Sequence, residues 1–165
     1  MMPPKLIMVP LDFSAASQNA LEVATRMASH VGASLLLVHI APMIADLPQN
    51  VSIFKEGAYN KELHVESAKR LSEIAGSLEA KKLNVRTEVG TANDVGMELV
   101  RVAEQESVDM IIIATHGMTG WREVAFGSVA KVVVERATCP VLVLRAKAEN
   151  KDTEPESRAS AAAQH

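Results

Sequence analysis

Apolar residues along this chain alternate between a strand-like and a helix-like spacing. The runs Lys5 to Leu11, Ser34 to Ile40 and Met110 to Ala114 are almost wholly apolar over several residues, which is typical of strands buried on both faces of a parallel sheet. In the stretches between them, apolar residues recur every three or four positions, which indicates amphipathic helices. The pattern therefore predicts strands and helices in alternation.

Four helical faces can be read from this spacing. They are Leu21, Ala24, Ala28 and Val31; Ala68, Leu71, Ala75 and Leu78; Val95, Leu99, Val102 and Ala103; and Val129, Val132 and Val133. Ser14 precedes the first helix and Ser128 the last, so each is expected to be an N-cap, because their hydroxyls can accept from a free backbone N–H. Gly32 is expected to end the first helix.

Two weaker strands complete the pattern. Leu83 to Val89 alternates apolar with polar residues, which indicates a half-exposed strand at a sheet edge, and Val141 to Leu144 is a short last strand. Five strands alternating with helices predict right-handed crossovers and an α/β fold of the Rossmann type, an open parallel sheet with helices on both faces. Ligands bind such sheets at the carboxyl ends of the strands, where Asp12, Ile40 and Ala114 lie.

The chain length of 165 residues suits one domain, which we assign to residues 1–145. Residues 146–165 have no hydrophobic period and mix charged residues with Ser, Pro and Ala, so a disordered tail is expected there. The connection Pro42 to Tyr59 is long and unusually apolar. It could be a lid over a site, a surface for a partner, or a segment folded back on the core.

Composition excludes several classes of function. A net charge of -3, no basic cluster and only 3% aromatic residues argue against a nucleic-acid surface. A single cysteine, Cys139, excludes an internal disulfide and a thiolate metal site, and it is expected to be a small buried residue. The apolar stretch Leu6 to Leu11 is too short for a membrane span or a signal core, so a cytoplasmic protein is expected.

Candidate chemistry lies where the Met110 strand gives way to a helix. After Ala114 the chain enters a loop containing Gly117, and the helix starts at Gly127 and Ser128. Glycines let a backbone approach a polyphosphate closely and adopt positive φ. The N–H groups at the helix start, including that of Val129, lack partners within the helix and attract anions. A phosphate site is therefore predicted at this junction.

The same residues carry a family resemblance. Written Gly-x2-Gly-x9-Gly-Ser, the motif resembles the ATP-binding signature of the universal stress protein family, with Gly117, Gly127 and Ser128 in place and Ala114 at the first glycine. Three more segments are similar to the family in the same order: Val9 to Ser14, Leu36 to Ile40 and Cys139 to Leu144. Ala114 is small and ends a strand, so the backbone can still approach a phosphate closely at this position if the φ of Ala114 is negative.

The resemblance implies strand order 3-2-1-4-5, bound ATP with Mg²⁺, and a homodimer formed through Val141 to Leu144. It also implies a set of nucleotide contacts: Pro10, Leu11, Asp12, Ile40, Ala114, His116, Gly117, Met118, Gly127, Ser128 and Val129. Alternatives stay open for several of them. Asp12 and Ser128 could serve as helix caps without contacting a nucleotide. Ile40 could be an ordinary core residue. His116 could orient the loop instead of donating a hydrogen bond to phosphate.

Taken with these residues, the resemblance implies three candidate functions. The first is a regulatory ATP-binding module of the stress response whose nucleotide biases a dimer surface. The second is a slow ATPase or self-phosphorylating protein, for which the motif offers only His116 and Arg122. The third is a nucleotide-free interaction protein with the same fold. No catalytic residue and no protein-held metal is assigned, because the histidines lack ligand spacing and no Gly-x4-Gly-Lys motif is present.

Overall fold

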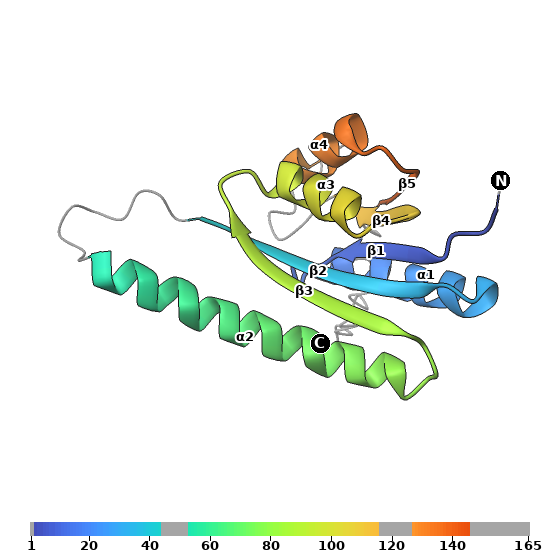
Figure 1. Ribbon diagram of the computed structural model, residues 1–165, viewed down its shortest axis with the longest axis horizontal. Coiled ribbons are helices and arrows are strands. Elements are labelled where there is room, and N and C mark those ends of the chain that lie inside the picture. Colours follow the sequence, from blue (N-terminus) through green and yellow to red (C-terminus); the bar gives the residue numbers. More distant parts are fainter. Residues whose placement is uncertain (1, 44–52, 116–126, 146–165) are drawn as a thin grey trace, which may run out of the picture.

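A computed structural model describes residues 2–43, 53–115 and 127–145 of the chain, with α2 side chains described from Lys61 onward (Figure 1). Strands and helices alternate along the described chain, as the hydrophobic pattern predicts. The elements are β1 (Leu6–Pro10), α1 (Ala15–Val31), β2 (Ser34–Pro42), α2 (Ile53–Glu79), β3 (Val85–Ala92), α3 (Val95–Gln105), β4 (Met110–Ala114), α4 (Ser128–Arg136) and β5 (Val141–Leu144).

The strands form one parallel sheet in the order β3-β2-β1-β4-β5. This confirms both the predicted fold class and the predicted order. Because the chain winds one way from β1 to β3 and the other way through β4 and β5, β1 and β4 lie side by side, with Ile7 opposite Met110. The alternating strand predicted near Leu83 to Val89 is the edge strand β3, and β5 is the other edge.

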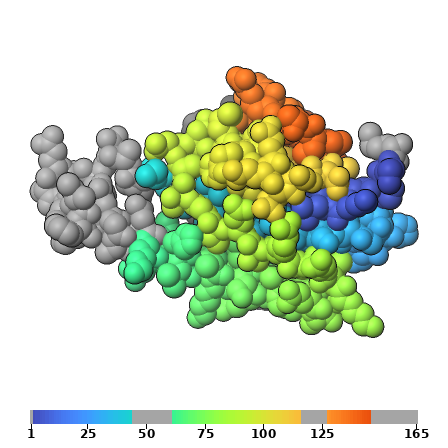
Figure 2. Space-filling view, viewed as in Figure 1, coloured from blue at the N-terminus to red at the C-terminus, as the bar shows by residue number. Residues whose placement is uncertain are grey.

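Helices cover both faces of the sheet. Alternate strand residues point to opposite sides, so Ile7 and Val9 of β1 pack with α1 and α2, whereas Met8 packs with α3 and α4. Figure 1 shows α3 and α4 on one side of the sheet and the long α2 on the other. In the space-filling view of Figure 2, the β3 side chains occupy the surface between these layers.

The ends of α1 are as expected, but the start of α4 is not. The Ser14 hydroxyl accepts from Ser17 N at 3.2 Å, and Gly32, with φ 74°, ends α1 in the left-handed conformation. At α4 the N-cap is Gly127, and Ser128 is the first helical residue. The prediction that Ser128 is an N-cap is wrong because the helix begins one residue earlier than its apolar face.

Two further predictions fail at element ends. Val31 is exposed because the buried stripe of α1 runs in steps of four through Ala20, Ala24 and Ala28, which leaves the last residue of the helix outside it. The connection predicted over Pro42 to Tyr59 is shorter, since β2 includes Pro42 and α2 starts at Ile53. Residues 44–52 and the predicted tail 146–165 lie outside the described residues.

None of the helices in the described ranges is long and apolar enough to cross a membrane.

Candidate functional site

A cleft of about 650 Å³ opens at the carboxyl ends of β1 and β4. It lies where the winding direction of the sheet reverses, which is the usual ligand position in open α/β sheets. The starts of α3 and α4 form its other wall. Its volume is within the range of small-molecule sites.

Most of the residues predicted from the sequence to contact a ligand meet in this cleft. Those that line it are Pro10, Leu11, Asp12, Ile40, Ala114, Gly127, Ser128 and Val129. They belong to or adjoin β1, β2, β4 and α4, so segments more than one hundred residues apart in the sequence line the same cleft. His116, Gly117 and Met118 lie outside the described residues, and their predicted role stays a prediction.

Sequence reasoning missed the contribution of the β3–α3 connection. Asn93 and Asp94 line the cleft, and Asp94 also caps α3 by accepting from Met97 N at 3.0 Å. The predicted strand order contained the signal for them, because it places the carboxyl end of β3 next to that of β2. Thr115, which follows β4, is buried and also lines the cleft.

Asp12 supports the cap of α1 and also lines the cleft. Its Oδ1 accepts from Ser14 N at 3.0 Å and from Ser14 Oγ at 2.6 Å, so it orients the residue that caps α1. Burial tends to raise the pKa of Asp12, but the bonds from Ser14, helped by the Ser17 hydroxyl, outweigh burial and hold this pKa below its ordinary value. An ionised acceptor therefore lines the cleft at neutral pH.

Backbone hydrogen bonds join the two ends of the glycine motif. Thr115 N donates to Leu144 O at 2.8 Å, and Gly127 N donates to Thr115 O at 2.6 Å. These bonds hold the end of β4 against the start of α4. They also connect the cleft to the edge strand β5.

The glycine motif needs less conformational freedom than its sequence suggests. Ala114 is not among the described residues with positive φ, so its methyl group lies on ordinary extended backbone. Gly127 has φ −64°, which any residue can adopt. The expectation that Gly127 provides positive φ is wrong, and its small size is the property that remains relevant.

The start of α4 presents backbone donors. Lys131 N donates to Gly127 O at 3.0 Å, which is the first bond of the helix. Helix geometry leaves the N–H groups of Ser128, Val129 and Ala130 without an acceptor inside α4, and the helix dipole adds partial positive charge there. All three residues line the cleft, so an anion could bind at this end.

Close packing with glycine shapes the apolar part of the cleft. A Cβ on Gly90 of β3 would stand 3.0 Å from Ile40 Cδ1, and a Cβ on Gly96 of α3 would stand 2.6 Å from the Val132 Cβ of α4. Ile40, Gly96 and Val132 all line the cleft. Gly96 therefore lets α3 approach α4 closely, and Gly90 leaves room for the Ile40 side chain.

His39 and Cys139 have structural roles. His39 Nδ1 lies 2.7 Å from Leu11 O, so the ring is hydrogen-bonded to the turn after β1. Cys139 is half-buried among apolar residues, and this burial raises the pKa of its thiol. A raised pKa makes the reactive thiolate scarce, as expected for a packing residue.

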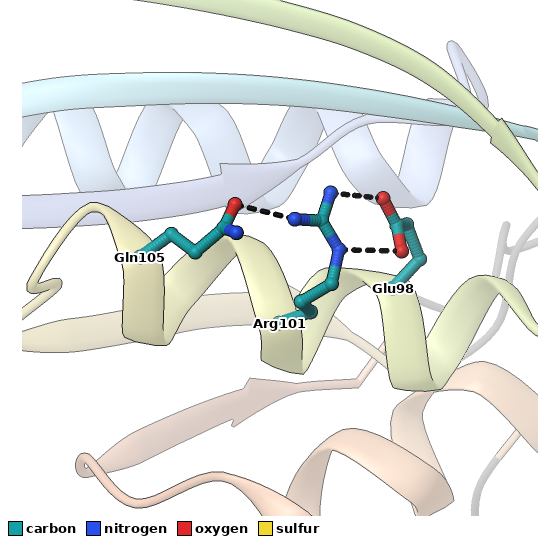
Figure 3. Close-up of polar contacts among 3 residues, drawn as sticks. All are labelled: Glu98, Arg101 and Gln105. Carbon is teal, nitrogen blue, oxygen red and sulfur yellow. Dashed lines mark hydrogen bonds and ion pairs between the residues drawn. The ribbon is translucent and has the colours of Figure 1, made fainter.

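The polar cluster in Figure 3 lies on α3 and is satisfied within itself. Arg101 Nε donates to Glu98 Oε2 at 2.8 Å, and the other guanidinium nitrogens bond to Glu98 and Gln105. The bond from Arg101 lowers the pKa of Glu98. Such exposed pairs add little to stability.

In the described ranges, no group of three His, Cys, Asp or Glu side chains could hold a metal ion.

Comparison with known proteins identifies the family. A family model described as the universal stress protein family matches residues 4–145. The chain belongs to this family. Among curated relatives, universal stress protein MJ0531 of Methanocaldococcus jannaschii is 30% identical over 86% of this chain and 82% of its own length. Universal stress protein MJ0577 of the same organism is 29% identical over 87% of this chain and 96% of its own length.

Solved structures share the fold of this universal stress protein. MJ0577 superimposes with a TM-score of 0.75 and 27% identity, covering 90% of this chain and 99% of MJ0577. UspA from Lactobacillus plantarum gives a TM-score of 0.71 and 26% identity, covering 86% and 97% of the two chains.

More distant family members with the same fold were solved with nucleotides. One universal stress protein was solved in complex with cAMP, with a TM-score of 0.56 to this chain, 19% identity and coverage of 87% and 98%. The protein from Archaeoglobus fulgidus was solved in complex with dAMP, with a TM-score of 0.60, the same identity and the same coverage. At this identity the likeness to our chain is one of fold.

Proposed function

We propose that this chain is a regulatory ATP-binding module whose nucleotide occupies the cleft between β1 and β4. The single observation that carries the proposal is the chemical asymmetry of the cleft. The ionised Asp12 carboxylate lies on its β1 side, and the N–H groups at the start of α4 lie on another. Acceptors suit a base amine or ribose hydroxyls, whereas helix N-termini suit phosphates.

This asymmetry also orients the ligand. A phosphate beside Asp12 would be repelled by the carboxylate, so the adenosine end belongs near Asp12 and the apolar Ile40. The phosphates then belong near Ser128 and Val129, with Mg²⁺ carried by the nucleotide. The cAMP and dAMP complexes of distant family members support an adenine nucleotide as the ligand class.

A dimer through β5 completes the proposed function. Val141, Leu142, Val143 and Leu144 are all apolar and all partly exposed at a sheet edge. The opposite edge, β3, carries the charged residues Arg86 and Glu88, which disfavour strand pairing. Because Thr115 N bonds to Leu144 O, the end of β5 adjoins the cleft, and bound nucleotide can influence the dimer surface.

The test is ATP binding by isothermal titration calorimetry with Mg²⁺, together with assay of nucleotide released from the purified, denatured protein. Ser128→Asp places a negative charge where phosphate is proposed and should weaken ATP binding at least about tenfold while sparing adenosine. Ala15→Asp is a matched control, because Ala15 is also exposed as the first residue of a helix, but lies outside the cleft.

Three outcomes separate the functions. A wild-type protein that carries no adenine nucleotide and takes none up would refute the module. Binding gained only on Ala114→Gly would favour the nucleotide-free interaction protein. Release of many phosphates per chain, abolished by Ser128→Asp, would favour a slow ATPase.

A further inference from the structure

Phe13 has a backbone conformation that bulky residues rarely adopt. Its φ is 63°, in the left-handed region, and it stands between Asp12, which lines the cleft, and Ser14, which caps α1. Strain of this kind persists only where the surroundings hold it in place. The contacts of the Phe13 side chain therefore bear on the position of Asp12.

Two side chains from other elements contact the Phe13 ring. The guanidinium Cζ of Arg70, on α2, lies 4.1 Å from the ring centroid, within cation–π range. The His39 ring, on β2, has its centroid 4.6 Å away and is tilted by 32°. His39 also contacts the turn through Leu11 O, so contacts from β2 and α2 flank Asp12 on both sides along the chain.

Arg70 is not among the residues that line the cleft. It lines a separate groove of about 350 Å³ with Phe13, Gln18, Glu73, Ile74 and Ser77, between α1 and α2. The cleft is on the α3 and α4 side of the sheet. The contact with Phe13 links Arg70 to the cleft through the turn between β1 and α1.

We propose that Arg70 and Phe13 are positioning residues for Asp12: their stacking, supported by His39, holds the strained turn so that the Asp12 carboxylate faces the cleft and accepts from Ser14. The part of this inference that concerns ligand affinity rests on the proposed ATP function. The part that concerns the turn does not, because the bond from Ser14 N to Asp12 Oδ1 can be measured without nucleotide.

The experiment compares Arg70→Met with Lys69→Met in the full chain. Both changes remove one exposed positive charge from neighbouring positions of α2, but only Arg70 contacts Phe13. Amide hydrogen exchange of Ser14, followed by NMR, reports the bond to Asp12. We expect Arg70→Met to speed this exchange about tenfold and to raise the Kd for ATP severalfold. Lys69→Met should alter neither the exchange rate nor the Kd.

A double-mutant cycle distinguishes positioning from a general loss of structure. In an Asp12→Ala background, Arg70→Met should not raise the Kd for ATP further, because the carboxylate that it positions is gone. Unchanged Ser14 exchange in Arg70→Met, or an unchanged Kd in a protein that binds ATP, would overturn the inference. A wild type without ATP affinity would refute the proposed function instead, and Ser14 exchange would still decide whether Arg70 holds the turn.

Discussion

Gly96 on α3 and Val132 on α4 approach so closely that no side chain fits between them. A Cβ on Gly96 would stand 2.6 Å from the Val132 Cβ and 3.3 Å from the Val129 carbonyl oxygen. The obstructing atoms belong to the stiff, β-branched part of a valine and to backbone, so neither can move aside cheaply. This contact sets the separation of two helices that line the cleft.

Gly96→Ala should therefore be costly although Ala is the better helix former. We expect it to lower the free energy of unfolding by about 1–3 kcal/mol, the usual cost of overpacking, measured by urea denaturation. Gly76→Ala is the matched control, because Gly76 is an exposed glycine within α2 and a Cβ there meets nothing within 4 Å. It should raise stability by about 0.5–1 kcal/mol. Equal effects of the two changes would show that the α3–α4 contact is not tight.

Ser14→Ala should destabilise α1 and disturb Asp12 together. The hydroxyl of Ser14 accepts from Ser17 N and donates to Asp12 Oδ1, so both bonds are lost. Loss of an N-cap costs about 1 kcal/mol. Ser72→Ala, at an exposed position inside α2, should cost nothing, because Ala favours helix more than Ser does. Thermal unfolding of the two variants followed by circular dichroism makes the comparison, and equal melting temperatures would contradict it.

Asp109 should make stability depend on pH in the acid range. Its Oδ2 accepts from Leu6 N at 2.9 Å and from Lys5 N at 2.8 Å, and these bonds lower the pKa of the carboxyl. Because the folded-state pKa is depressed, the stabilisation is complete above the ordinary aspartate pKa of about 3.9 and is lost as the pH falls through the folded-state value.

The measurement for Asp109 is urea denaturation of wild type and Asp109→Asn between about pH 6 and pH 3. The free energy of unfolding of the variant should be lower than that of wild type at about pH 6, and the difference between the two should become smaller as the pH falls. A difference that stays constant over this range would mean that the charge of Asp109 does not contribute through these bonds.

Val143→Lys should convert the proposed dimer to a monomer. The change puts a charge on the apolar edge strand β5, where strand pairing would have to bury it. Thr87→Lys makes the corresponding change on the other edge, β3, at an exposed position, and should leave the dimer intact. Sedimentation velocity gives both masses. A monomeric wild type, or two dimeric variants, would exclude pairing through β5.

Sequence reasoning succeeded wherever one periodicity dominated a segment. Apolar runs located β1, β2 and β4, and the alternation of apolar and polar residues located β3. The alternation of strands with helices along the chain implied a parallel sheet. The order of the strands came from family resemblance and is confirmed. Errors occurred at element ends, as with Val31 and Ser128, because a cap depends on where the chain turns and not only on residue type.

For the cleft, sequence motifs located the residues that follow β1 and β4 but not those that follow β3. Asn93 and Asp94 belong to no recognised motif, and only the three-dimensional order of the strands places them beside Ile40. The strained φ of Phe13 was equally invisible, since nothing in the residue type indicates positive φ. The contacts that hold its ring are tertiary, since His39 and Arg70 lie far from Phe13 along the chain.

The unlike edges of the sheet also limit how far it can assemble. If β5 pairs with β5 of a second copy, that pairing uses the apolar edge of both chains, and the edges left over are β3, with Arg86 and Glu88. A sheet in which both edge strands can pair with other copies can add copies indefinitely and grow into filaments. A sheet with only one edge strand able to pair stops at a closed dimer. The charges of β3 would thus protect the paired protein against aggregation.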